Sequence, residues 1–170
     1  MSKSADDQEF FLTLVGQHQR MLLKVCWAYT RSSHDREDLF QEIVARLWSA
    51  FGTYDRNRTF STWMYRVALN VAIDFRRRQM RRRDETANTD VTNQAASHSD
   101  GQRQELLEEL HELLERQSDA DRAILVLHLE GNSHREIAEI IGISESNVGT
   151  RLSRLKESLR ASAHTAQEKP

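Results

Sequence analysis

Apolar residues between Thr59 and Arg83 recur at the spacing of one buried face of an α-helix. This feature constrains the fold most, because a helix with one apolar face is stable mainly where other apolar surface covers it. The face consists of Phe60, Trp63, Met64, Val67, Ala68, Val71 and Phe75. Since Trp63 belongs to this face, the spacing favours a core position for its ring over a surface one.

The opposite side of this helix carries groups that suit nucleic acid. It is expected to present Tyr65, Arg66, Asn70 and Asp74, and arginines occupy six of the eight positions 76–83. Rings stack on bases, amides read base edges and guanidinium groups hold phosphates, a combination suited to single-stranded or locally opened nucleic acid. An ordinary amphipathic helix with a solvated basic end has the same pattern. The rest of the chain decides between these two interpretations.

Two earlier segments supply matching apolar faces. Residues 8–30 form one helical pattern, and a second helix is expected from about Asp35, which can cap it, to about Ala50. The first face consists of Phe10, Phe11, Leu14, Val15, Met21, Leu22, Val25 and Cys26, and the second of Leu39, Phe40, Ile43, Val44, Leu47, Trp48 and Phe51. With the helix after Thr59, these segments predict a three-helix bundle.

The exposed side of the second helix is polar and mostly charged. It carries Glu37, Asp38, Gln41, Glu42 and Arg46. Such charges by default form a solvated surface. The loop that follows, F-G-T-Y-D-R-N-R, combines turn-forming residues with a tyrosine and two arginines, Arg56 and Arg58.

The middle of the chain is acidic and poor in apolar residues. Residues 1–83 carry 15 basic and 9 acidic side chains, whereas residues 84–121 carry 2 basic and 11 acidic ones. Residues 84–104 contain one large apolar residue, Val91, and cannot bury enough surface to offset their ordering entropy. They predict a flexible acidic linker between two functional ends. Helical spacing then returns in a stripe of Leu106, Leu107, Leu110, Leu113 and Leu114.

The C-terminal part carries the signals of a helix-turn-helix. Ser133 and Glu136 form an S-x-x-E capping box after the turn at Gly131, and Ser144 can cap the next helix. Ala138, Gly142 and Val148 supply a small residue where helices cross, a glycine in the turn and a branched residue that locks the second helix. The residues expected to point outward are Ser146, Asn147, Thr150, Arg151, Arg154 and Lys156. A purely structural helical hairpin has the same spacing, but the pattern favours DNA binding.

Composition excludes several other classes of protein. No apolar run approaches the length of about 18 residues that a membrane span needs, and the N-terminus lacks the apolar core of a signal peptide. The single cysteine, Cys26, excludes an internal disulfide, and the seven histidines lack the paired spacing of a metal site. We expect a cytoplasmic protein without a metal, a cofactor or a membrane insertion of its own.

The two ends together resemble one family, the extracytoplasmic-function sigma factors of bacterial RNA polymerase. The first end is similar to the second conserved region of that family in D-R-E-D-L-F-Q-E-I-V-A-R-L-W and R-T-F-S-T-W-M-Y-R-V-A-L-N-V-A-I-D-F-R-R-R. The second end is similar to the fourth region in H-R-E-I-A-E-I-I-G-I-S-E-S-N-V-G-T-R-L-S-R-L-K-E-S-L-R. Both motifs, in this order and joined by an acidic linker, make the resemblance specific.

The resemblance implies an all-α protein of two small helical domains, residues 1–83 and 105–164, joined by the linker 84–104. It implies that Asp38, Gln41, Glu42 and Arg46 bind core RNA polymerase. It also implies that Arg56, Arg58, Tyr65, Arg66, Asn70, Arg76 and Arg77 recognise and open the minus-ten element of promoter DNA. The outward residues of the helix-turn-helix are implied to read the minus-thirty-five element, and an anti-sigma factor is the expected inhibitor.

Two departures and two alternatives accompany this resemblance. A Leu-Pro pair that often precedes the fourth region is missing, and Gly149 stands where a basic residue is common. A helix-turn-helix regulator that is no polymerase subunit would leave residues 36–83 without a role in polymerase binding. A nucleic-acid enzyme would want a carboxylate cluster for metal ions or a phosphate-binding loop, and the sequence shows no Gly-rich loop of that kind.

Overall fold

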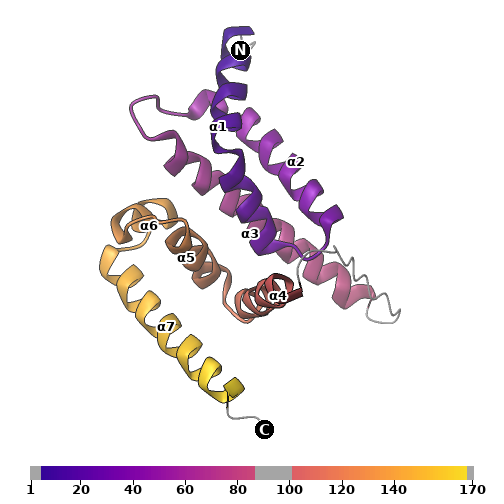
Figure 1. Cartoon of the computed structure of the whole chain (residues 1–170). Coiled ribbons are helices and arrows are strands. Elements are labelled where there is room, and N and C mark those ends of the chain that lie inside the picture. The colour runs from indigo at the N-terminus through magenta and orange to yellow at the C-terminus, as the bar shows by residue number, and fades with distance from the viewer. Residues whose placement is uncertain (1–4, 87–100, 168–170) are drawn as a thin grey trace. The chain divides into compact units, whose positions relative to one another are not determined.

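The computed structural model describes the backbone of residues 5–86 and 101–167, and the side chains of 5–86 and 104–161. Every regular element in these ranges is helical, as the sequence predicts. The chain divides into two compact units, residues 1–97 and 98–170, which are described separately below. The first holds α1 to α3 and the second α4 to α7 (Figure 1).

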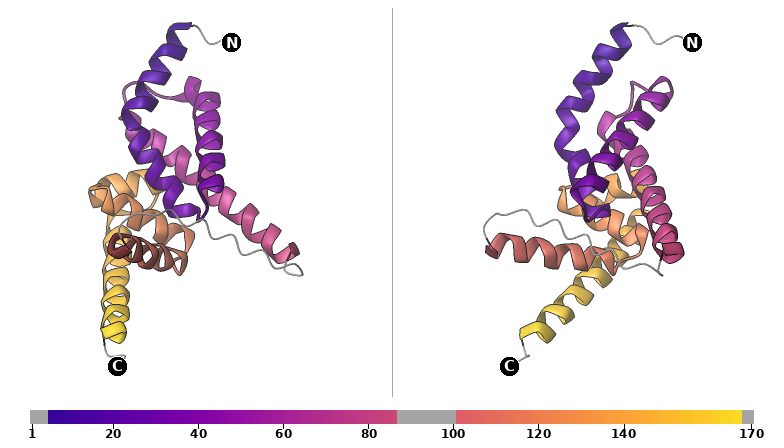
Figure 2. Two further views of the ribbon diagram at one scale, coloured as in Figure 1. Left: turned by 45° about the vertical axis from the view of Figure 1, so that its right-hand side comes forward. Right: turned by 90° about the vertical axis from the view of Figure 1, so that its right-hand side faces the viewer.

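The first unit is a bundle of three long helices. It consists of α1 (Ala5–Tyr29), α2 (Ser33–Ala50), a short 3-10 turn η1 (Phe51–Thr53) and α3 (Phe60–Thr86). The three helices pack against one another in pairs, with Leu22, Leu39, Ile43, Leu47 and Met64 fully enclosed between them. The arginine-rich end of α3 extends past the ends of α1 and α2 (Figure 2). The predicted three-helix bundle is therefore confirmed.

Three details of this bundle differ from the sequence expectation. Ser32, and not Asp35, caps α2: its hydroxyl oxygen accepts the Asp35 backbone N–H at 3.0 Å and donates to the Asp35 carboxylate at 2.7 Å. The apolar stripe of α1 is narrower than expected, because Phe10 is 39% exposed. Residues 84–86, assigned to the linker, still belong to α3.

The second unit begins before the predicted end of the linker. Helix α4 (Gly101–Glu115) starts at residue 101, and the remaining linker residues 87–100, predicted to be flexible, lie outside the described residues. Only part of the predicted leucine stripe of α4 is covered: Leu114 is buried, whereas Leu106 and Leu107 are exposed. The carbonyl oxygen of Leu114 accepts a 2.9 Å hydrogen bond from the Nε of the buried Arg122, which joins α4 to α5.

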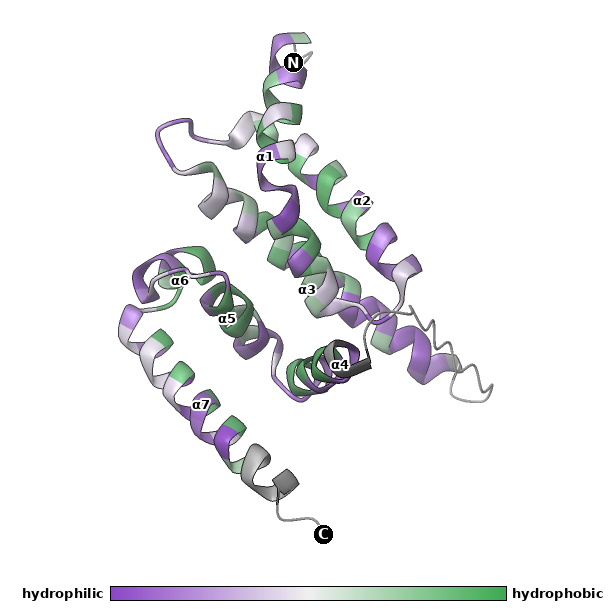
Figure 3. Cartoon of the chain, viewed as in Figure 1, coloured by the Kyte–Doolittle hydropathy of each residue, from purple (hydrophilic) through white to green (hydrophobic). Residues whose placement is uncertain are grey.

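The other three helices of this unit are α5 (Asp119–Leu129), α6 (His134–Ile141) and α7 (Glu145–Gln167), and they pack against one another in pairs. Helix α5 is the most apolar element in the hydropathy colouring (Figure 3), and its residues Ala123 to Leu127 are buried. Gly131 and Gly142 end α5 and α6 with φ angles of 83° and 82°, a left-handed conformation that glycine adopts without a steric penalty. No helix in the described part of the chain meets the length and apolarity that a membrane span requires.

Candidate nucleic-acid and polymerase interfaces

The polar side of α2 presents the four predicted residues together. Asp38, Gln41 and Arg46 are exposed and Glu42 is half-buried on one face of the helix. Both carboxylate oxygens of Glu42 accept hydrogen bonds of 2.7 Å from Nη2 of Arg78, a residue of α3. The face is thus not a row of independent solvated charges, since α3 contributes a guanidinium group to it.

An aromatic cluster supports the loop between η1 and α3. The Tyr54 ring lies 5.3 Å, centroid to centroid, from both Phe60 and Trp63, and these two rings are 5.5 Å apart. Phe51 joins the cluster to α1 through Phe11 at 5.1 Å. Trp63 therefore has aromatic partners within the fold, but it is half-buried and lies at the edge of the core that its spacing favours.

The loop is also held by hydrogen bonds. The Tyr54 hydroxyl donates to the carbonyl oxygen of Arg58 at 2.7 Å, and the carboxylate of Asp55 accepts the backbone N–H of Asn57 at 2.9 Å. The Arg58 guanidinium lies 3.9 Å from the same carboxylate. These contacts fix the backbone that presents the two predicted loop arginines.

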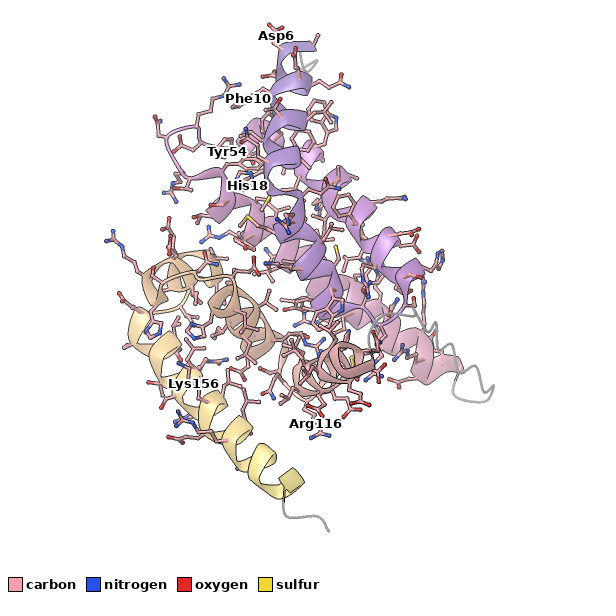
Figure 4. The ribbon with its side chains drawn as sticks, viewed as in Figure 1. Asp6, Phe10, His18, Tyr54, Arg116 and Lys156 are labelled. Carbon is pink, nitrogen blue, oxygen red and sulfur yellow. The ribbon has the colours of Figure 1, made fainter. Side chains whose placement is uncertain are left out.

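Arg56 connects the loop to the first turns of α1. Its Nη2 donates to the carboxylate of Asp7 at 3.1 Å, and its guanidinium carbon lies 5.0 Å from the centroid of the Phe10 ring. Asp7, Arg56 and Tyr54 line a cavity of about 210 Å³ together with Phe51 and Gly52. Phe10 and Tyr54, labelled in Figure 4, mark the two elements that meet here. Arg56 and Arg58 remain exposed at the loop surface.

Helix α3 exposes most of the predicted promoter residues but not Tyr65. Arg66, Asn70 and Arg77 are exposed and Arg76 is half-buried, whereas Tyr65 is 1% exposed. The prediction that Tyr65 lies on the polar side is wrong. At about 100° per residue, Tyr65 lies about 40° from Leu69 around the helix and about 140° from Asn70, so it belongs to the apolar side.

The helix-turn-helix forms as predicted. Ser133 and Glu136 make the reciprocal capping box, and the backbone N–H groups of Gly142 and Ile143 both donate to the carbonyl oxygen of Ala138. Val148 is fully buried, and the Ser144 hydroxyl accepts the Asn147 N–H at 3.2 Å. The predicted outward residues that are exposed are Ser146, Asn147, Thr150, Arg154 and Lys156.

Arg151 departs from this outward set. It is half-buried, and its Nη1 donates to the carboxylate of Asp121 in the first turn of α5 at 2.9 Å. About 300° of helix rotation, equivalent to 60°, separates it from the buried Val148. Its side chain therefore lies at the border of the core, and the expectation that it points outward with Arg154 is corrected.

The side chains of His128, Glu136 and Cys26 have shifted pKa values with identifiable causes. Burial, followed by the positive charge of Lys156 and the neighbouring His134, lowers the pKa of His128. The backbone N–H and hydroxyl of Ser133 lower the pKa of Glu136 by donating to its carboxylate. Burial raises the pKa of Cys26 to about 12, which fits a small apolar core residue. Within the part of the chain that the structure describes, no cluster of histidine, cysteine or acidic residues has the arrangement of a metal site.

The sequence missed two residues that shape these surfaces, Arg78 and Asp121. Arg78 stood among six arginines with nothing to single it out, and its partner Glu42 lies 36 positions earlier. Asp121 has a local signal, because Ser118 and Asp121 have the three-residue spacing of a helix cap, but its ion pair with Arg151 spans 30 positions. The sequence therefore predicts the cap spacing of Ser118 and Asp121, but not the ion pairs with residues 30 or more positions away.

Comparison with known proteins identifies both units. Residues 14–82 match the family model described as Sigma-70 region 2, and residues 104–159 match the one described as Sigma-70, region 4. The chain is 30% identical to the ECF RNA polymerase sigma factor SigW of Bacillus subtilis, covering 91% of this chain and 89% of SigW. The chain belongs to the extracytoplasmic-function sigma factors of the sigma-70 family.

Further matches agree with this family. The sigma factor is 29% identical to RNA polymerase sigma factor NccH of Alcaligenes xylosoxydans, over 95% of this chain and 90% of NccH. Its fold is similar to CnrH, solved with the cytosolic domain of CnrY, with a TM-score of 0.70, 23% identity and coverage of 95% and 91% of the two chains. It is also similar to RpoE of Bartonella quintana, solved with the anti-sigma factor NepR, with a TM-score of 0.72, 17% identity and coverage of 90% and 96%.

Proposed function

We propose that this sigma factor divides promoter recognition among three surfaces. The polar face of α2, with Asp38, Gln41, Glu42 and Arg46, binds core RNA polymerase. The loop 54–59 and the exposed side of α3 bind the opened minus-ten element. The exposed side of α7 reads the minus-thirty-five element in the major groove. The protein acts in the cytoplasm as an initiation factor without chemistry of its own.

The observation that carries this proposal is the position of Asn70. Its amide is exposed on α3, on the same side of the helix as Arg66 and Arg77. An amide both donates and accepts, so it can bind the edge of one extruded base while nearby guanidinium groups hold phosphates.

Strand opening without ATP requires that the protein bind the unstacked strand better than the duplex. Each stacked or flipped base returns roughly 1–3 kcal/mol, so a few such contacts offset the cost of opening several base pairs. The loop suits this task because its conformation is fixed before DNA arrives, so less ordering entropy is lost on binding.

The first arm of the test asks whether the polar face of α2 binds core polymerase or is only a solvated surface. A chain with Asp38→Ala, Gln41→Ala and Glu42→Ala is expected to keep its helical circular dichroism and to bind core enzyme at least about tenfold more weakly, a loss of about 1.4 kcal/mol. A control with Gln17→Ala and Gln19→Ala, on the exposed side of α1, should bind core enzyme normally. Undiminished affinity of the triple variant would make the α2 face a solvated surface.

The second arm tests strand opening by Asn70→Ala. Core binding and closed-complex formation should be spared, whereas permanganate reactivity of promoter thymines should fall. A pre-melted bubble should restore transcription if Asn70 acts mainly in opening, and only partly if it also reads a flipped base. Normal permanganate reactivity together with normal base preference would contradict the assignment.

We also propose that an anti-sigma factor restrains this protein. This proposal is supported by the complexes in which similar structures were solved: RpoE with the anti-sigma factor NepR, and CnrH with the cytosolic domain of CnrY. A pull-down of the tagged chain from its native cells should recover core polymerase subunits and a small inhibitor protein. Recovery of polymerase alone, under conditions with and without stress, would count against an inhibitor.

A further inference from the structure

The ion pair between α7 and α5 has a fixed acidic partner. Asp121 accepts the Arg151 guanidinium through Oδ1 at 2.9 Å and the Ser118 hydroxyl through Oδ2 at 2.7 Å. Its backbone N–H donates to the Ser118 hydroxyl oxygen at 3.1 Å. The carboxylate is therefore part of the α5 cap, and Arg151 binds to an anchored group and not to a freely rotating surface acid.

The pair is also partly sheltered from water. The side chains of Arg151 and Asp121 are 36% and 27% exposed, and Arg151 stands next to the buried Leu152 on α7. Charge pairs at such a border are screened less than fully exposed ones. The buried Val148, Leu152 and Leu155 set which side of α7 faces the core, and the ion pair holds the Arg151 guanidinium against α5.

We propose that Asp121 is a positioning residue for duplex recognition, which keeps Arg151 off the DNA and leaves the contacts to the exposed Asn147, Thr150 and Arg154. This inference rests on the proposed reading of duplex DNA by α7. An unrestrained arginine on this helix would reach phosphate groups, which contribute affinity without sequence information. By pairing Arg151 internally, Asp121 lowers non-specific binding and so raises the ratio of specific to non-specific affinity.

The test compares holoenzymes that contain the full-length chain or its variants. The probes are a promoter duplex selected from a random library by the unaltered holoenzyme, and the same duplex with its minus-thirty-five segment scrambled. Closed-complex affinity for both is measured across a salt series. A phosphate contact changes the slope of log affinity against log salt by about 0.9, so a difference of one contact is resolvable.

Asp121→Asn should bind the scrambled duplex more tightly at low salt, increase the salt slope by about 0.9, and narrow the affinity ratio between the two duplexes. Asp119→Asn is the matched control, because it removes the same charge from the same first turn of α5. Adding Arg151→Gln to Asp121→Asn should return the salt slope to that of the unaltered holoenzyme. Equal slopes for the Asp121 and Asp119 variants would overturn the proposal.

A second variant guards against a folding defect in Asp121→Asn. Arg151→Gln alone should leave the salt slope and the scrambled-duplex affinity unchanged, because its guanidinium is not on the DNA. A lower slope in this variant would show that Arg151 binds phosphate in the unaltered protein, and would overturn the proposal by itself. Arg154→Gln tests the underlying function separately: if it leaves affinity for the selected duplex unchanged, α7 does not read DNA and the proposed function fails first.

Discussion

The helix-turn-helix and the loop-α3 surface are built by different kinds of contact. In the helix-turn-helix, Ser133, Glu136, Gly142 and Ser144 act on backbone groups within a few positions of themselves. The loop of the first unit has local hydrogen bonds of its own, but it also depends on partners far along the chain, such as Asp7 for Arg56. The helix-turn-helix is thus specified mainly by local contacts, whereas the surface formed by the loop and α3 also needs contacts from other elements of the first unit.

This difference predicts that one substitution in the first unit disturbs much of that unit and nothing in the second. Phe51 is 6% exposed and its ring contacts those of Phe11 and Trp63. Phe51→Ala should cost about 3–5 kcal/mol, because it removes a ring from a packed cluster and leaves a cavity. Amide hydrogen exchange should accelerate throughout α1 to α3 and stay unchanged in α5 to α7.

The matched control for that experiment is Phe10→Ala, which removes a ring that is 39% exposed. It should destabilise the first unit much less than Phe51→Ala. Faster exchange in α6 and α7 of the Phe51 variant would contradict the independence of the two units.

A smaller effect tests how far the stability of the helix-turn-helix depends on contacts between residues that are close in sequence. Ser133→Ala removes the cap of α6 and should cost the second unit about 1 kcal/mol at neutral pH. The lowered pKa of Glu136 means that its contribution is present above about pH 4.5, its ordinary value, and is lost as the pH falls through the lower folded-state pKa. The backbone N–H of residue 133, the larger cause of that shift, remains in the variant, and only the hydroxyl donor is lost. The variant should therefore lose only slightly less stability than the unaltered chain as the pH falls below about 4.5.

Thermal melting of the second unit, followed by its own amide signals across a pH series, measures both expectations. Ser153→Ala, an exposed serine within α7, is the control and should change neither midpoint nor pH dependence appreciably. A pH dependence in Ser133→Ala equal to that of the unaltered chain would show that the Ser133 hydroxyl does not contribute to the lowered pKa of Glu136.

The smallest effect concerns Gly149 in α7. A β-carbon there would meet the imidazole of His134 at 3.7 Å, an ordinary contact distance, and α7 is helical on both sides. Gly149→Ala should therefore stabilise the second unit by somewhat less than about 1 kcal/mol through helix propensity alone. A lower melting midpoint would show that the approach of α6 and α7 at this point needs glycine.

The sequence predicted the helices, most of their apolar faces and the helix-turn-helix, because helical spacing and capping residues act within one or two turns of the chain. The same reasoning placed Asn70, Thr150 and Arg154 on exposed faces. It failed for Tyr65, where the apolar side of α3 is wider than the stripe of its most hydrophobic residues. The width of a buried face is set by how many helices cover it, which no single helix encodes.

The pairing of charges was decided by tertiary structure. Which of six arginines meets Glu42, and whether Arg151 points to solvent or to Asp121, depend on the rotation and offset of one packed helix against another. Helical spacing fixes the direction in which a side chain leaves the axis of its own helix, and residue type fixes its length and charge. They do not fix which acid, 30 or more positions away, packing brings within hydrogen-bond distance, since that follows from the shape of the whole core.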